Sequence, residues 1–317
     1  MEKGKFAWGD FSNLNNVTDL ENYIKYRKPT EKELRKTSND KYQYQRAYNH
    51  SNFFHYTKLK NIDKILKGNA FLLSRVGNSN DPIENNITNK ERLFALCFST
   101  GINENLPLWY LYSGVNGKGG RLCFTKSQIY SLINEGCYSL VEINSETREI
   151  NSEICELHKT EDISVEFQDI LYVKENKEFI DLKYNTMTNH SNITTKEFKE
   201  FENKYPAFIK SLIWYYEKET RLLVTLKDNI FQLLESNRTY AVRLSFDKLD
   251  DVINGMKLTL APEFALNDEG ESKTDDEIDM ELRKNTNINR WLVNTSRYKK
   301  SEYSGQVKMQ LCKKCDK

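Results

Sequence analysis

The sequence from residue 53 to residue 74, FFHYTKLKNIDKILKGNAFLLS, changes its hydrophobic periodicity twice within one short stretch. The aromatic run FFHYT predicts a strand, and AFLLS predicts a second, buried one. Between them, one face of a predicted helix carries Leu59, Ile62, Ile65 and Leu66. Gly68 is the residue at which we expect that helix to end. A chain that alternates strand and helix at such short intervals favours a mixed fold over a pure bundle or sandwich.

Strands and helices continue to alternate irregularly along the chain, without an internal repeat. We therefore predict an α+β fold, with a single mixed domain at residues 51–305 built around a split or strongly twisted, mainly antiparallel sheet. Residues 1–50 are polar and broken, which predicts an N-terminal polar and helical extension. Residues 306–317 are predicted to form a C-terminal tail.

The overall charge limits what the chain binds. Its 317 residues include 47 Lys and Arg against 46 Asp and Glu, a formal charge of +1, so there is no global electrostatic case for nucleic acid or an acidic membrane. No apolar run approaches the roughly 20 residues that span a bilayer. The start of the sequence also has no apolar signal core. We therefore expect a cytoplasmic protein without a membrane partner.

The cysteines give no metal signature. Cys312 and Cys315 form a CxxC pair in the tail, but one such pair supplies only two of the ligands that a structural zinc ion needs. We interpret the pair as part of a solvated tail and predict no metal site.

Polar side chains stand out within two aromatic segments. His55, Tyr56 and Thr57 end the first predicted strand, and Tyr112 follows Trp109 in a short predicted helix. An edge-strand histidine with a satisfied hydrogen bond is the structural interpretation of the first segment. For the second segment, packing in the core is the structural alternative to a platform for a ligand ring.

A turn follows the second predicted strand. Its sequence is Asn80-Asp81-Pro82, with Glu84 two residues further on. As structural elements, Asp81 would cap a short helix and Glu84 would favour its first turn. As functional elements, the same side chains would line one wall of a pocket.

The stretch KSLIWYYEKETRLLV carries the strongest pattern of charges. Glu217 and Glu219 lie two residues apart where the chain is predicted to leave a helix and enter a hydrophobic strand. On a strand this spacing places both carboxylates on one face, and Arg221 continues that face. The structural alternative is a salt-bridge ladder at the start of a strand.

Taken in order, these motifs resemble the bacterial domain-of-unknown-function 2971 family over residues 50–300. The residues that match its pattern are His55-Tyr56-Thr57, Asn80-Asp81-Pro82 with Glu84, Phe98-Ser99, Trp109 with Tyr112, and Trp214 with Tyr216, Glu217, Glu219 and Arg221. The pattern also has a glycine-led strand, which here starts at Gly119 or Gly120. The family name implies no activity.

A second resemblance does imply one. A His-x-Thr strand, a central aromatic residue and a late Glu-x-Glu are similar to ADP-ribosyltransferases, including those of DNA-modifying toxins. The resemblance implies an ADP-ribosyltransferase-like fold and NAD as the substrate. His55 would bind the ribose, Tyr112 or Tyr56 would stack on nicotinamide, and Glu219 would be catalytic with Glu217 assisting. Such domains occur as toxins and phage-defence effectors, so an antitoxin or a defence-system protein is an expected partner.

The remaining site residues complete the predicted NAD site. Thr57, Asn80 and Asp81 would line it beside His55, and Arg221 would orient Glu219 or contact the diphosphate. The acceptor of the ADP-ribose group stays open between protein, nucleic acid and water.

Two other functions compete with NAD chemistry. In a non-enzymatic sensor or partner-binding module, the same residues would form a structural polar network. In a metal-dependent nuclease, Asp81 would combine with Glu217 and Lys218, provided that Lys218 lies on the strand. We favour NAD cleavage over both.

Overall fold

The computed structural model describes residues 50–78, 84, 87, 89–100, 104–112, 118–173, 207–267, 271–284, 287–288, 291 and 298–301. The predicted extension at residues 1–50 and the tail with Cys312 and Cys315 thus lie, apart from His50, outside the described residues. The chain divides into two compact units. Among the described residues, unit 1 comprises those within 72–97 and 137–244, and unit 2 comprises those within 50–71, 98–136 and 245–301. Strands β2 (Ala70–Arg75) and β3 (Leu93–Ser99) contribute residues to both units.

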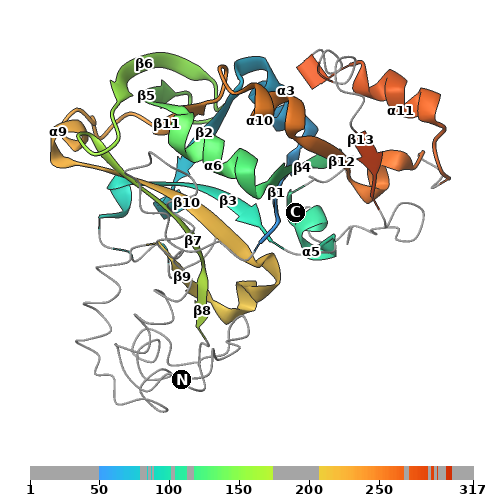
Figure 1. The fold of residues 1–317 in the computed structure, drawn as a ribbon, viewed down its shortest axis with the longest axis horizontal. Coiled ribbons are helices and arrows are strands. Elements are labelled where there is room, and N and C mark those ends of the chain that lie inside the picture. Colours follow the sequence, from blue (N-terminus) through green and yellow to red (C-terminus); the bar gives the residue numbers. More distant parts are fainter. Residues whose placement is uncertain are drawn as a thin grey trace. The chain divides into compact units, whose positions relative to one another are not determined.

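Unit 2 contains a small sheet. Strand β1 (Asn52–Lys58) is antiparallel to β4 (Gly119–Thr125), which is antiparallel to β12 (Lys257–Leu260), while β13 (Tyr298–Lys300) runs parallel to β12. Its described helices are α3 (Leu59–Gly68), α5 (Leu106–Tyr112), α6 (Lys126–Glu135), α10 (Asp250–Gly255), α11 (Asp275–Leu282) and the 3-10 helix η4 (Pro262–Ala265) (Figure 1).

The first helix of unit 2 forms where the periodicity predicted it. Leu59, Ile62 and Ile65 of α3 are buried. The helix ends at Gly68, as predicted, but its C-cap is Asn69, which adopts the left-handed conformation with φ 41°. Asparagine tolerates this conformation better than most residues because its short side chain bonds to the nearby backbone.

A glycine in β4 makes room for α3 and β12. A Cβ at Gly120 would lie 2.8 Å from Ile62 Cδ1 and 2.7 Å from Leu258 Cδ1. Because both distances are too short for carbon atoms, a side chain at residue 120 would displace Ile62 and Leu258, which are both fully buried. Of the two glycines that the sequence left open, Gly120 therefore has a packing reason.

Aromatic rings fill the centre of unit 2. Phe98 packs edge-on against Phe124 at 6.0 Å and against Phe71 at 6.5 Å between ring centroids. Edge-to-face pairs of this kind add to the free energy gained by burying the rings. Phenylalanines thus provide much of the core that a chain with only 38% hydrophobic residues needs.

Unit 1 is built from longer strands. Strand β10 (Glu219–Leu226) pairs with β3 and lies antiparallel to β7 (Ile163–Asp169). Strand β11 (Tyr240–Ser245) lies between β2 and β5 (Cys137–Ile143), and β5 is antiparallel to β6 (Ile150–Leu157). A separate parallel pair joins β8 (Leu171–Val173) to β9 (Ile209–Ser211). The described helical segments are η1 (Val76–Asn78), η2 (Lys90–Arg92), η3 (Leu212–Glu217) and α9 (Asp228–Phe231).

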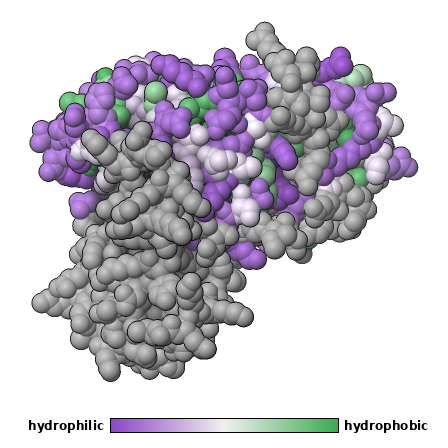
Figure 2. All heavy atoms as spheres, in the orientation of Figure 1, coloured by the Kyte–Doolittle hydropathy of each residue, from purple (hydrophilic) through white to green (hydrophobic). Residues whose placement is uncertain are grey.

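Helices and a mainly antiparallel arrangement of strands confirm the α+β class. The ADP-ribosyltransferase-like arrangement and the domain boundaries stay predictions. None of the helices within the described ranges is long and apolar enough to cross a membrane. The described residues on the face in Figure 2 are mostly hydrophilic, with hydrophobic residues in small separate spots, which agrees with a chain that is 29% charged.

Candidate functional site

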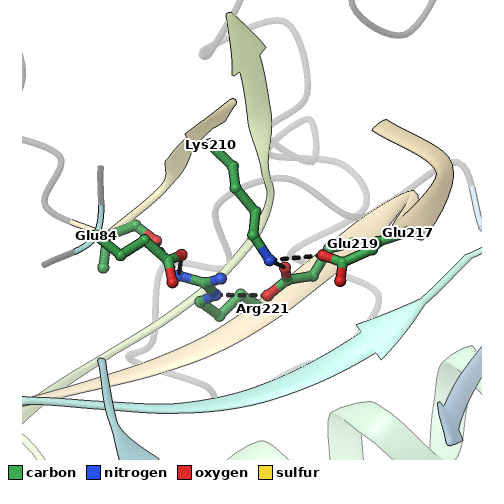
Figure 3. A network of polar contacts seen from close by, with 6 residues as sticks. Glu84, Lys210, Glu217, Glu219 and Arg221 are labelled. Atoms are coloured by element: carbon green, nitrogen blue, oxygen red, sulfur yellow. Dashed lines mark hydrogen bonds and ion pairs between the residues drawn. The ribbon is translucent and has the colours of Figure 1, made fainter. Parts of the chain in front are cut away.

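Five charged side chains in unit 1 form one buried group, which we call the charged cluster. Its members are Glu84, Lys210, Glu217, Glu219 and Arg221 (Figure 3). Their exposed fractions lie between 1% and 6%. Figure 3 shows the five side chains pointing toward one another from separate parts of the chain. Buried charges are stable only when paired, so their arrangement is tightly constrained.

Strand β10 places two members of the charged cluster. Glu219 is its first residue, and Arg221 follows two positions later on the same face, as the sequence predicted. Glu217 is different, because it ends the 3-10 helix η3 instead of lying on the strand. Between the two glutamates, Lys218 is exposed and has φ 44°, a left-handed conformation. The prediction that both glutamates lie on the strand is therefore wrong for Glu217, although its side chain still reaches the cluster.

Arg221 joins two carboxylates. Its Nε donates a hydrogen bond to Glu219 Oε1 at 2.6 Å, and its Nη1 donates to the carbonyl oxygen of Ala207 at 2.8 Å. The same Nη1 lies 2.5 Å from Glu84 Oε1, as an ion pair that is not aligned as a hydrogen bond. Burial acts to lower the pKa of Arg221, but the Glu219 and Glu84 carboxylates outweigh it and raise that pKa well above its usual value.

Lys210 forms ion pairs with Glu217 and Glu219, the two glutamates of the predicted catalytic site. Its Nζ donates to Glu217 Oε2 at 2.5 Å and to Glu219 Oε2 at 3.1 Å, and it lies 5.3 Å from the centre of the Trp214 ring. Although burial lowers the pKa of Lys210, the two carboxylates raise it above its ordinary value. Lys210 therefore stays charged and holds the glutamates together.

Lys210 reaches this position because the helix predicted before β10 does not form. Residues 209–217 form the short strand β9 followed by the 3-10 helix η3. Pairing of β9 with β8 fixes the backbone of Lys210, whose register partner is Tyr172. A stretch with β-branched and aromatic residues is ambiguous between helix and strand, and here the tertiary pairing decides.

The neighbouring cations keep Glu219 ionised. Burial by itself would raise the pKa of this carboxyl group, but the Arg221 and Lys210 charges more than compensate and hold the pKa below its ordinary value. Arg221 occupies Oε1 and Lys210 occupies Oε2. The site thus contains a buried carboxylate with fixed orientation and permanent charge.

Cys97 of β3 borders the charged cluster and was not predicted. Because β3 pairs with β10, residues on one face of the two strands are neighbours. Ala95 packs with the group that includes Leu223, and further along the same two strands the Cys97 thiol hydrogen bonds to Glu219. The Cys97 side chain is exposed, whereas Glu219 is buried. Cys97 is therefore a member of this site that solvent reaches.

The surroundings of Cys97 predict a slow thiol. The protein around it desolvates the thiolate despite the exposed side chain, and the Glu219 charge opposes ionisation, so both raise the pKa of Cys97 well above its ordinary value. We expect iodoacetamide at pH 8 to alkylate Cys97 at least about tenfold more slowly than Cys137, another exposed cysteine of unit 1. Mass spectrometry of the two peptides over time measures both rates.

A comparison variant separates electrostatics from steric access. In Glu219→Gln the opposing charge is lost while Arg221 and Lys210 stay, so alkylation of Cys97 should accelerate and that of Cys137 should not change. Equal rates at the two cysteines, or an unchanged rate at Cys97 in the variant, would contradict the prediction.

The remaining described candidates lie in unit 2. Tyr56 is buried, its hydroxyl accepts from Arg121 Nη1 at 3.1 Å and from the Asn105 backbone N–H at 3.2 Å, and its ring packs edge-on against Trp109 at 4.8 Å. Burial raises the pKa of Tyr56. These contacts use both the ring and the hydroxyl, so Tyr56 serves as part of the core.

The arginine that donates to the Tyr56 hydroxyl, Arg121, belongs to a second buried ion pair. Arg121 Nη2 lies 3.3 Å from Glu104 Oε1, and the guanidinium is 4.4 Å from the centre of the Phe54 ring. Glu104 also accepts from Trp109 Nε1 at 3.0 Å. This group anchors the start of helix α5, at whose end Tyr112 is 41% exposed. Of the two aromatic residues predicted to stack on a ligand, Tyr112 is thus the exposed one.

His55 and Thr57 are half-buried on β1. The His55 ring packs edge-on against Phe71 at 5.5 Å and Phe98 at 6.1 Å. The Thr57 hydroxyl accepts from Asn61 Nδ2 at 2.9 Å. The two remaining candidates, Asn80 and Asp81, lie outside the described residues.

The structure therefore brings together one part of the predicted site. Glu217, Glu219 and Arg221 lie in the charged cluster with Glu84, while His55, Tyr56, Thr57 and Tyr112 belong to unit 2. Comparison with protein-family models, curated proteins and solved structures gave no match.

Proposed function

We propose that this protein cleaves the nicotinamide–ribose bond of NAD and transfers ADP-ribose to an acceptor. The observation that carries the proposal is Glu219, a buried carboxylate that Arg221 and Lys210 orient and keep ionised. Loss of nicotinamide generates positive charge on the ribose, as glycoside cleavage does. A fixed negative charge beside the ribose stabilises that transition state more than the ground state.

The charge balance of the cluster supports this role. Three carboxyl groups, those of Glu84, Glu217 and Glu219, face two cations, Lys210 and Arg221. The cluster therefore has one carboxyl group more than it has cations. The positive charge that develops on the ribose in the transition state complements that excess.

The second glutamate suits transfer to an acceptor. Glu217 shares Lys210 with Glu219, so the two carboxylates are tied to one ammonium group. We assign to Glu217 the removal of the proton from the acceptor while the ribose is attacked, because general-base catalysis needs a proton acceptor beside the reacting centre and a carboxylate can be that acceptor. The contacts of Arg221 favour orientation of Glu219 over binding of the diphosphate.

The proposal gives the remaining candidates the roles that the resemblance implies. His55 and Thr57 would contact the ribose, Tyr112 would stack on nicotinamide, and Asn80 and Asp81 keep the contact with NAD that the sequence predicted. The acceptor is a protein, a nucleic acid or water. An antitoxin or a phage-defence protein would control such an activity in the cell.

The main competing interpretation is a non-enzymatic sensor or partner-binding module whose charges are structural. It is favoured by the burial of all five members of the cluster and by their mutual pairing. The nuclease alternative is less well supported, because Lys218 is exposed and precedes β10 instead of lying on it.

Nicotinamide release tests the proposal. The purified protein is incubated with NAD alone, with single-stranded DNA, with RNA and with a protein extract, each with and without EDTA, and nicotinamide is measured by chromatography. We expect nicotinamide release in every reaction that contains EDTA. One class of acceptor should increase this release, and mass spectrometry should detect ADP-ribose attached to that acceptor. Glu217→Gln should lower the transfer to that acceptor more than the release of nicotinamide into water.

Absence of release with every acceptor would contradict the enzyme proposal and support the structural network. Nucleic acid cleavage that stops on addition of EDTA would instead support the nuclease.

A further inference from the structure

Strand β6 (Ile150–Leu157) is an edge strand of unit 1. Within the part of the chain that the structure describes, β5 is the strand that pairs with it, and Figure 1 shows β6 at the outer side of β5. The residues from Ile150 to Ile154 are all exposed. Because successive side chains point to opposite faces, both faces of this half of the strand are open to solvent.

The exposed side chains of β6 are of two kinds. Ile150 and Ile154 are 45% and 37% exposed. Glu153 and Glu156 are exposed carboxylates on the same strand. Beside them, an outer edge offers backbone N–H and C=O groups in a row that another strand can pair with.

From these features we propose that β6 binds an extended segment of a partner protein, which adds to the sheet as a further strand. The segment that fits has apolar residues facing Ile150 and Ile154 and Lys or Arg residues opposite Glu153 and Glu156. Main-chain hydrogen bonds supply affinity in this mode of recognition, and the alternate side chains supply specificity.

The acidic residues argue against a second copy of this chain as the occupant. Pairing of β6 with β6 of another copy would bring Glu153 and Glu156 of both copies to one seam. Like charges directly opposite each other in a sheet are destabilising. A basic segment of another protein removes that repulsion and replaces it with attraction.

Irregular pairing of β5 with β6 limits the length of such a segment. The register shifts between Leu140 and Val141 and again between Glu142 and Ile143. Bulges of this kind twist the strands and discourage open-ended pairing along an edge. The edge therefore suits one short strand and opposes continuous aggregation.

A labelled peptide of alternating lysine and valine is the probe for this surface. Fluorescence anisotropy at low salt measures its binding to the full chain, and hydrogen–deuterium exchange locates it. We expect binding together with protection of the backbone amides of Ile150–Leu157. A glutamate–valine peptide and a lysine–valine peptide with a central proline should bind more weakly.

Two matched variants assign the binding to β6. Glu153→Lys should weaken binding of the lysine–valine peptide about fivefold or more, because it replaces a cross-strand attraction with a repulsion. Leu233→Lys changes a residue of unit 1 that is 49% exposed outside β6, and it should leave binding within twofold of the wild type. Both variants are at exposed positions, so both should keep the fold.

Absence of binding, binding without protection of β6, or equal binding by Glu153→Lys would each overturn the proposal. Dimerisation of the chain alone with protection of β6 would also overturn it and identify a second copy as the occupant. None of these outcomes depends on whether the protein acts on NAD.

Discussion

Replacing Arg221 with methionine should lower the free energy of unfolding by about 3–5 kcal/mol. Methionine keeps the apolar stem of the side chain but leaves Glu219 and Glu84 buried without the cation that they share. Their mutual repulsion and desolvation are then uncompensated, and the carbonyl oxygen of Ala207 loses its donor. Urea unfolding followed by circular dichroism measures the change.

Arg238 provides the matched control. It also bridges two carboxylates of unit 1, those of Glu142 and Glu235, but its side chain is 44% exposed. Water solvates these charges in the variant Arg238→Met as well, so the unfolding midpoint should change little. Similar losses in the two variants would contradict the structural argument, because burial would then not distinguish the pairs.

The sequence predicted the elements that depend on local periodicity. The strand and helix around Leu59, Ile62 and Ile65 formed as expected, because apolar residues at helical spacing must face a core. The placement of Glu219 and Arg221 on one face of a strand was also confirmed, since the hydrophobic run after them leaves few alternatives. Local patterns thus placed two of the five members of the charged cluster, Glu219 and Arg221.

The positions of Lys210 and of the neighbouring Cys97 depended on contacts between residues far apart in the sequence. Lys210 lies in a stretch whose apolar and aromatic residues fit a helix as well as a strand, and its strand exists because β8 pairs with it. Cys97 meets Glu219 because β3 pairs with β10, although the two residues are distant along the chain. A single sequence contains no direct signal for either pairing.

Tyr56 shows that neighbouring residues of one sequence motif can have different roles, one in the core and others in the predicted site. The sequence grouped it with His55 and Thr57 as a ligand contact, but Arg121, Asn105 and Trp109 enclose it. Side chains alternate between the faces of β1, so adjacent residues of a motif cannot all face one pocket. The alternation of β1 is thus the physical reason to treat Tyr56 separately from its neighbours.

Changing Glu219 to glutamine should lower the rate of nicotinamide release by about 10²–10³, as the loss of one well-placed electrostatic contact does in other enzymes. The amide keeps the shape of the carboxylate and removes its charge. The fold should survive, because Lys210 still pairs with Glu217 and Arg221 still pairs with Glu84. Two carboxylates then face two cations, and NAD binding should persist.

Glu281→Gln is the matched control for this experiment. Glu281 of α11 also lies between two cations, Lys118 and Lys273, but belongs to unit 2 and has no role in the proposed chemistry. Its variant should release nicotinamide within about twofold of the wild type. Release is compared at saturating NAD, with circular dichroism of each variant to confirm the fold. Wild-type release by a folded Glu219→Gln protein would remove this carboxylate from the mechanism, because the charge that stabilises the transition state would then have to come from another residue.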